Sequence, residues 1–256
     1  MEVITKQQLF LLEEIVKKNF SAKYKDSVLG ILWSVIKPLL IMIIMTIIFS
    51  TLFHNKIENY PIYLLSGKCI FDFFSAGTNV SLMAIKGNKN ILTKTSAPKF
   101  IFILGAVISE FINFIISIII LIVVMIVTRS PFYFSSLPLG FIPVISLLMM
   151  LIGLGFILSI LCVYYTDIKH LWGVITMMTM YASAIFYPMD IIPEPFHQIM
   201  ILNPIYWIIE LFRDFVIYGI MPDALFVTNS LLLSAIILIF GIIFFTKFEK
   251  QTTMKF

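Results

Sequence analysis

The sequence predicts an all-α integral membrane protein with six transmembrane helices. Three observations lead to this fold class. Hydrophobic residues make up 60% of the 256 residues and charged residues only 12%, against roughly a quarter charged in a typical soluble domain. Several apolar runs reach the ~20 residues that a spanning helix needs. The lysines gather in alternate connecting segments, as cytoplasmic loops require. Lipid must therefore solvate the apolar surface of this chain.

Each long apolar run gives one predicted span. The first follows a basic stretch, in which Lys23, Lys25 and Lys37 can extend their ammonium groups toward the headgroups. Trp33 suits the membrane interface, and Pro38 should kink the helix. We read the whole chain, 1–256, as a single transmembrane domain. Its predicted spans are 29–53, 60–85, 100–128, 139–165, 171–187 and 225–245.

Residues 1–28 predict a cytoplasmic interfacial helix. Thr5 can cap it, and Leu9, Leu12, Ile15 and neighbouring apolar residues recur at helical spacing with charged residues opposite. An ordinary soluble helix packed on a partner is the alternative. The segment lacks the basic, apolar and small-residue order of a signal peptide, so the first span should act as both targeting signal and anchor.

The distribution of charge orients the chain, with both termini in the cytoplasm. Thirteen lysines fall on the side of the termini and three basic residues on the other, which is a strong positive-inside pattern. The three are Lys56, Arg129 and Arg213; the thirteen are Lys6, Lys17, Lys18, Lys23, Lys25, Lys86, Lys89, Lys94, Lys99, Lys169, Lys247, Lys250 and Lys255.

The external segment 188–224 is predicted to hold short re-entrant helices. It has five prolines, yet much of it is apolar. Asn203 followed by Pro204 is typical of a helix cap and first turn. The following piece carries Glu210 and Arg213 and is too short to span, so its backbone must be buried in protein or line a wet cavity.

The cytoplasmic loop 86–99 is the best candidate for a partner surface. It contains four lysines and no acid, and its centre is long enough for a short helix before Pro98. Positive-inside topology alone explains the lysines, but it does not explain the apolar pair in the middle of the loop. The candidate contact residues are Lys86, Lys89, Ile91, Leu92, Lys94 and Lys99.

Three ionisable residues lie inside predicted spans, where they are costly unless paired or facing water. Lys68 and Asp72 are four residues apart and can neutralise each other. They form either a structural pair or part of a transport path. Glu110 must face protein or water, or be protonated; a proton relay is the weaker alternative because no series of acids accompanies it.

Aromatic residues are abundant in the second and fifth predicted spans and in the segment after the fifth. Most fit a lipid-facing or interfacial role. Aromatic faces also stack on the C–H faces of sugars, while Tyr and Trp donate to hydroxyls, so some could line a path for a glycan. The candidates are Phe71, Phe74, Trp172, Tyr181, Phe186, Tyr187 and Tyr206.

The sequence carries no recognisable catalytic or cofactor site. His54, His170 and His197 lack spaced partners, and Cys69 and Cys162 lie in apolar runs without metal-ligand spacing. A phosphate-binding Gly-x-x-x-x-Gly-Lys-Ser/Thr loop is absent, and no basic stripe indicates nucleic acid. We therefore predict a transport subunit rather than an enzyme, and any ATP must bind another chain.

Several motifs resemble the permeases of ABC transporters that export O-antigen, capsule and teichoic acid. The resemblance starts with a basic-Tyr-x-x-Ser-x-Leu-Gly-x-x-Trp-x-x-x-x-Pro run entering the first span. It continues through Ser109–Asn113, the Asp-Ile pair after span four, Phe186-Tyr187-Pro188 and the outer Asn-Pro pair, in the family's order over essentially the whole chain. The matching residues include Tyr24, Ser27, Gly30, Trp33, Pro38, Asp167, Asn203, Pro204 and Arg213.

The resemblance implies a homodimer of this chain with two copies of an ABC ATPase subunit. ATP and Mg²⁺ would bind that ATPase, and loop 86–99 would be the coupling helix that docks on it. A lipid-linked polysaccharide would cross the cytoplasmic membrane between the two permease copies. The alternatives are an ABC permease for a small lipid or drug and, from another class, an ion-coupled secondary transporter that needs no ATPase.

Overall fold

A computed structural model describes residues 5–25, 27–53, 57–95 and 97–252, and these residues form only helices and connecting turns. His54, Lys56 and Lys255, which were included in the sequence predictions, lie outside the described residues. The principal helices are α1 (Lys6–Tyr24), α2 (Trp33–Phe53), α3 (Tyr60–Met83), α4 (Lys89–Leu92), α5 (Lys99–Val127), α6 (Phe141–Tyr164), α7 (Ile168–Tyr181), α8 (Glu194–Ile201), α9 (Pro204–Arg213) and α10 (Ala224–Thr252).

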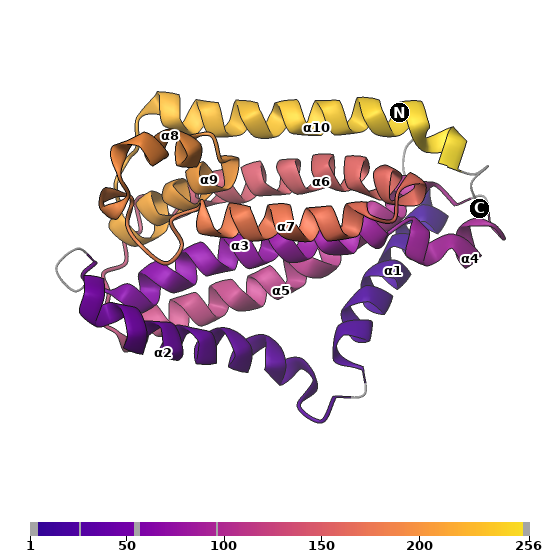
Figure 1. The fold of residues 1–256 in the computed structure, drawn as a ribbon. Coiled ribbons are helices and arrows are strands. Elements are labelled where there is room, and N and C mark those ends of the chain that lie inside the picture. Colours follow the sequence, from indigo (N-terminus) through magenta and orange to yellow (C-terminus); the bar gives the residue numbers. More distant parts are fainter. Residues whose placement is uncertain (1–4, 26, 54–56, 96, 253–256) are drawn as a thin grey trace.

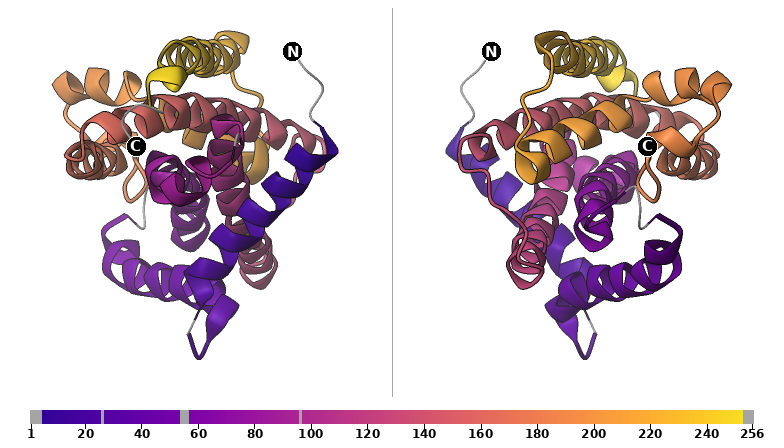
Figure 2. Two further views of the ribbon diagram at one scale, coloured as in Figure 1. Left: turned by 90° about the vertical axis from the view of Figure 1, so that its right-hand side faces the viewer. Right: turned by 90° about the vertical axis from the view of Figure 1, so that its left-hand side faces the viewer.

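The long helices lie side by side along one axis, and α1 crosses obliquely at their edge (Figures 1 and 2). The short helix α4 lies at one end of this bundle, together with the start of α1 and the last turn of α10 (Figure 1). Helices α8 and α9 lie at the opposite end. The two ends of the described chain are therefore at the same end of the bundle as α4.

Helix α3 is the centre of the bundle. It packs on α2, α5, α6, α7 and α9, and residues such as Ile70 and Phe73 are almost fully buried. The ring of Phe73 stacks on Phe114 of α5, with 4.9 Å between ring centroids. Because α3 is enclosed by other helices, its polar side chains can face protein instead of lipid.

Helices α6 and α10 make the most intimate contact. A Cβ atom on Gly241 would lie 2.3 Å from the carbonyl oxygen of Gly153, and one on Gly153 would lie 2.5 Å from the carbonyl oxygen of Ile237. Ser230 and Ser234 of α10 are also buried. Small residues at a helix interface allow backbones to approach closely, which is how apolar helices gain packing energy in lipid.

The predicted interfacial helix is confirmed as a helix. Thr5 and Gln8 form a reciprocal capping box at the start of α1. Its apolar side partly packs on α5, where Ile15 lies against Gly105. A Cβ atom added to Gly105 would lie only 2.6 Å from Ile15 Cγ2. Leu9 and Phe10 remain 53% and 66% exposed. The partner for this helix is thus α5 of the same chain, and part of its apolar side remains exposed.

Four described helices or helical runs are long and apolar enough to cross a membrane: Gly30–Phe49, Lys99–Val127, Leu137–Tyr164 and Ala224–Thr252. The other two predicted spans correspond to α3 and α7. Helix α3 has 24 residues but carries Lys68 and Asp72. Helix α7 has only 14 residues and ends at Tyr181, six residues before the predicted end.

Contacts from two other helices fix the early end of α7. Ala184 adopts φ +48°, a left-handed conformation that a helix cannot include. Its carbonyl oxygen accepts hydrogen bonds from Tyr63 and Arg213, which hold the turn in place. Beyond it, the predicted short helices of segment 188–224 are present as α8 and α9.

Candidate functional site

A cavity of about 490 Å³, lined by both polar and apolar side chains, lies where the end of α1, the start of α2, α3 and α5 meet. Its wall combines three lysines with two carboxylates, several hydroxyl groups and an amide, and the remainder is apolar and aromatic. The polar lining comprises Lys23, Tyr24, Ser34, Lys37, Lys68, Asp72, Ser75, Glu110, Asn113 and Ser117, and the apolar lining includes Trp33, Pro38, Ile41, Phe73 and Phe114.

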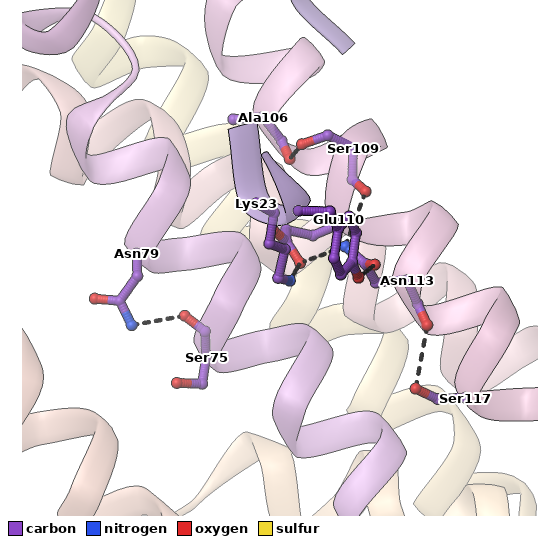
Figure 3. Close-up of polar contacts among 9 residues, drawn as sticks. Lys23, Ser75, Asn79, Ala106, Ser109, Glu110, Asn113 and Ser117 are labelled. Carbon is purple, nitrogen blue, oxygen red and sulfur yellow. Dashed lines mark hydrogen bonds and ion pairs between the residues drawn. The ribbon is translucent and has the colours of Figure 1, made fainter. Parts of the chain in front are cut away.

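Glu110 is neutralised by α1. Its side chain is 7% exposed, and Oε2 lies 2.8 Å from Nζ of Lys23. Asn113 donates to the same oxygen over 3.1 Å and accepts a 2.6 Å hydrogen bond from the Tyr24 hydroxyl. Figure 3 shows Lys23 directed at Glu110 and Asn113 from the neighbouring helix. This network ties the last turn of α1 to the middle of α5 and gives the Glu110 carboxylate two side-chain donors.

Lys68 and Asp72 form the predicted ion pair on α3. Both side chains line the cavity. The Lys68 side chain is 16% exposed and that of Asp72 is 47% exposed, so the pair lies at the wall of the cavity instead of in the packed core.

The loop between α3 and α5 contains the predicted short helix, α4. Lys89 and Lys94 are exposed, Lys86 and Ile91 are half-buried, and Leu92 is buried among Ile15, Ile85 and Phe102. Lys86 donates to Thr166 in the α6–α7 turn over 2.9 Å, and Lys18 of α1 donates to Asn88 over 2.7 Å. A partner docking here would therefore touch Lys89 and Lys94, while Leu92 anchors the loop to the bundle.

Lys99 has a different role from the other lysines of this loop. It is 9% exposed, and its ammonium donates to the Glu249 carbonyl over 2.7 Å and to the Thr252 hydroxyl over 2.9 Å. These acceptors lie in the last turn of α10. Lys99 thus binds the negative end of that helix and offers little surface to another chain.

The candidate aromatic residues fall into two groups. Phe71, Phe74 and Trp172 are buried between α3 and α7, and the Trp172 indole donates to Thr78. They are core residues of this chain. Tyr181 is 56% exposed, and Phe186, Tyr187 and Tyr206 are half-buried. The Tyr187 hydroxyl donates a hydrogen bond to the Tyr181 carbonyl, so these two tyrosines lie together at the end of α7.

Arg213 organises the end of the bundle that holds α8 and α9. It is fully buried, and it donates to the carbonyl oxygens of Tyr63 and Ala184 over 3.2 and 3.1 Å and pairs with Glu210 over 2.6 Å. Its guanidinium also lies 3.6 Å from the ring centroid of Tyr63. One side chain from α9 therefore connects α3 with the turn after α7.

Asn203 acts in the same region. Its Oδ1 accepts from the Ile205 amide over 3.0 Å, which caps α9 as predicted. Its Nδ2 donates to the Ala182 carbonyl and the Ser183 hydroxyl. With Pro204 as the first residue of α9, the Asn-Pro pair both starts the helix and holds it to the end of α7.

The remaining motif residues lie mainly at the α1–α2 connection. Ser27 Oγ accepts a hydrogen bond from the Gly30 amide; Trp33 is 45% exposed, and Pro38 lies inside α2. Asp167 is exposed at the start of α7, and its side chain makes no capping hydrogen bond. The structure thus brings Tyr24, Trp33 and Pro38 together around the cavity, and leaves Asp167 on the surface next to the Lys86–Thr166 contact.

Sequence reasoning missed two partners. Lys23 was expected to reach headgroups, but it pairs with Glu110, 87 positions away. Tyr63 was not singled out, yet it is the aromatic partner of Arg213 and donates to the carbonyls of Ala184 and Tyr187. No local pattern marks either contact; the one available signal was that an acid and an arginine in apolar surroundings each need a partner.

Long apolar helices and a cavity with charged side chains in its wall fit a membrane transport protein. The sequence matches the ABC-2 type transporter family over residues 11–217, and the chain belongs to that family. It is 30% identical over 212 residues to the O-antigen export system permease protein RfbA of Klebsiella pneumoniae, covering 82% of this chain and 81% of the relative. It is 22% identical over 245 residues to the polysialic acid transport protein KpsM of Escherichia coli, covering 94% and 92%.

Proposed function

We propose that this chain is the membrane-spanning permease subunit of an ATP-driven exporter that moves a polysaccharide across the cytoplasmic membrane. The observation that carries the proposal is the colinear similarity to export permeases over about four fifths of both chains. The absence of a nucleotide-binding loop from the sequence is in keeping with a subunit that depends on another chain for ATP.

In this proposal the chain crosses the membrane six times, through α2, α3, α5, α6, α7 and α10, with both termini in the cytoplasm. The central position of α3 supports its crossing, since its ion pair faces a protein cavity. The excess of lysine at the end that holds α4 supports the orientation. Helices α8 and α9 then close the outer side as re-entrant elements.

The transporter would contain two copies of this chain and two copies of an ABC ATPase, with ATP and Mg²⁺ on the ATPase. Helix α4 would dock on that subunit through Lys89 and Lys94, which are exposed. The cargo would be a lipid-linked glycan of the O-antigen or capsule type, passing between the two permease copies. The exposed Tyr181 and half-buried Phe186, Tyr187 and Tyr206 are the aromatic residues available to such a path.

Deleting the gene in its host cell tests the proposal. Export failure should leave full-length polysaccharide on the inner side of the cytoplasmic membrane, detected by radiolabelled sugar that becomes accessible to a glycosidase only after lysis. Reintroducing the chain should restore surface polysaccharide, and depleting cellular ATP should stop it. Normal surface polysaccharide in the deleted strain would contradict the cargo. Export that persists without ATP while an ion gradient remains would favour a secondary transporter.

A further inference from the structure

We infer that the connection between α5 and α6, residues 128–140 (the α5–α6 loop), binds the lipid of the membrane interface and thereby braces the end of α9. This requires only that the chain is embedded in a membrane, whatever its cargo and whichever ATPase it binds. The loop lies at the end of the bundle that holds α8 and α9 (Figure 1). In the orientation proposed above, it would contact the outer leaflet.

The loop presents large apolar side chains on the surface of the described chain. Phe134 is 79% exposed, and Phe141, which begins α6, is 70% exposed. Tyr133 and Leu137 are exposed as well. The segment 128–141 contains one charged residue, Arg129, and no acid, and Arg129 is exposed. Aromatic residues beside a single cation are typical of a segment at the membrane interface.

The surface next to the loop identifies what covers it. Helix α5 is long and apolar enough to cross a membrane, and the loop begins where its exposed face ends. Lipid covers such a face, so the exposed residues of the loop continue a lipid-facing surface. The exposed residues of the last turns of α5 are Ile119, Ile122, Val123, Ile126 and Val127.

The backbone of the loop is suited to a position partly out of water. Polar backbone groups at such a depth need partners within the protein. Pro131 and Pro138 have no N–H group to satisfy. Five other amides donate to backbone carbonyls of the loop itself or of the end of α5: those of Arg129, Ser130, Ser136, Leu137 and Leu139.

The same loop holds the turn that follows α9. This turn, Asp214–Tyr218, is π-helical and ends at Gly219, which has φ +65°; turns of this kind are rare and often lie at functional sites. The almost fully buried Ser136 donates to the Phe215 carbonyl over 2.8 Å. A Cβ atom on Gly219 would lie 2.3 Å from the ring of Tyr133. Lipid that holds the loop therefore also holds the end of α9.

Fluorescence tests where Phe134 lies. The full-length chain with Phe134→Trp is reconstituted in vesicles of dioleoyl phosphatidylcholine and phosphatidylglycerol, and the spectrum of the unaltered chain, which has three tryptophans, is subtracted. The added fluorescence should be quenched by brominated phosphatidylcholine and hardly by aqueous acrylamide. Lys94→Trp is the matched control, because Lys94 is exposed after α4, and it should show the opposite pattern. Phe141→Trp gives the same readout if Phe134→Trp fails to fold.

Two results would overturn the lipid contact. Quenching of the added tryptophan by acrylamide alone would mean that the loop lies in water. Protection from both quenchers would mean that protein covers the loop, either a second copy of this chain or another partner.

Hydrogen exchange tests the brace. Exchange of residues 214–221 is followed by mass spectrometry of the full-length chain in lipid nanodiscs. Phe134→Ser should speed this exchange about tenfold, since burial of one Phe side chain corresponds to at least that factor in an opening equilibrium. Phe240→Ser on α10 is the matched control, because Phe240 is also exposed and also lies beside a second Phe ring.

Unchanged exchange in Phe134→Ser would overturn the brace, as would an equal acceleration by Phe240→Ser, which would indicate a general effect of lost apolar surface. Neither experiment uses the ATPase, the cargo or transport. A failure of the proposed export function would therefore leave both results interpretable.

Discussion

Lys23 on α1 and Glu110 on α5 form an ion pair in which Nζ and Oε2 are 2.8 Å apart, although only 7% of the Glu110 side chain is exposed. The pair converts a costly acid within an apolar helix into an attachment point for α1. One turn along, Tyr24 and Asn113 make a second contact between the same two helices. The amphipathic helix is therefore fixed to the bundle by polar contacts as well as by Ile15.

Lys23→Ala should destabilise the chain by about 1–2 kcal/mol, because it leaves the buried Glu110 carboxylate with Asn113 as its one remaining side-chain donor in the described network. The loss is not larger because the Lys23 side chain is 42% exposed, so that solvent screens the ion pair. The measurement is thermal unfolding in detergent. Lys25→Ala is the control and should have no effect. In the double variant Lys23→Met with Glu110→Gln, part of the loss should return; a fully additive loss would mean that the two side chains are not coupled.

Arg213→Lys should cost about 2 kcal/mol or more. A single ammonium cannot reproduce the planar fork that reaches Tyr63, Ala184 and Glu210 at once. Unfolding in detergent measures the loss, and limited proteolysis within 188–224 should become faster. Arg129→Lys is the matched control, since Arg129 is exposed. Equal behaviour of the two variants would contradict the organising role of Arg213.

Gly153→Ala and Gly241→Ala should each destabilise the contact between α6 and α10, by roughly 1–3 kcal/mol. The added Cβ meets backbone atoms at 2.3–2.8 Å, and backbone cannot move aside as a flexible side chain does. Gly173→Ala on α7 is the control, because a Cβ there has nothing within 4 Å, and it should be neutral or slightly stabilising. The same thermal measurement applies, and unaltered melting of Gly241→Ala would contradict the packing.

Cysteine labelling should place the two ends of the bundle on opposite sides of the membrane. Leu202 is 80% exposed after α8, and Lys94 is exposed after α4. In intact cells or spheroplasts, a membrane-impermeant maleimide should react with Leu202→Cys, and with Lys94→Cys only after lysis. The native Cys69 and Cys162 are buried and should give little background. The reverse pattern would invert the proposed orientation.

Reversing charge on the exposed side of the α4 loop should weaken docking of the proposed ATPase. Lys89→Glu with Lys94→Glu should lower co-purification about tenfold through like-charge repulsion, if the partner surface is acidic. Lys6→Glu with Lys25→Glu removes the same number of exposed lysines from α1 and is the matched control. Leu92 should not be replaced in this test because it is buried. Undiminished co-purification and export would disprove the docking site.

The features set by local sequence could be predicted. The Thr5 and Asn203 caps, the Lys68–Asp72 pair and the short helix before Pro98 all depend on residues a few positions apart. The lengths of the apolar runs likewise located the long helices. The predicted end of α7 was wrong, because contacts from distant residues decide it: the Ala184 carbonyl accepts hydrogen bonds from Tyr63 and Arg213.

The candidate site was harder to predict because it depends on which helices are neighbours. Phe71, Phe74 and Trp172 are aromatic residues of the kind that could line a transport path. They are buried, however, and the rings of Phe74 and Trp172 meet where α7 packs on α3. Lys23, Lys37 and Glu110 are separated by up to 87 positions and meet only after α1 folds against α5. Apolar periodicity cannot specify that arrangement, since lipid and protein neighbours accept the same apolar residues.

Lys99 has a practical consequence for the carboxyl end of the chain. Its nearly buried ammonium depends on the Glu249 carbonyl and the Thr252 hydroxyl, so a chain shortened before Glu249 would strip two acceptors from a cation that water hardly reaches. A deletion that begins after Thr252 keeps both acceptors, whereas one that begins before Glu249 would weaken the attachment of the start of α5 to α10.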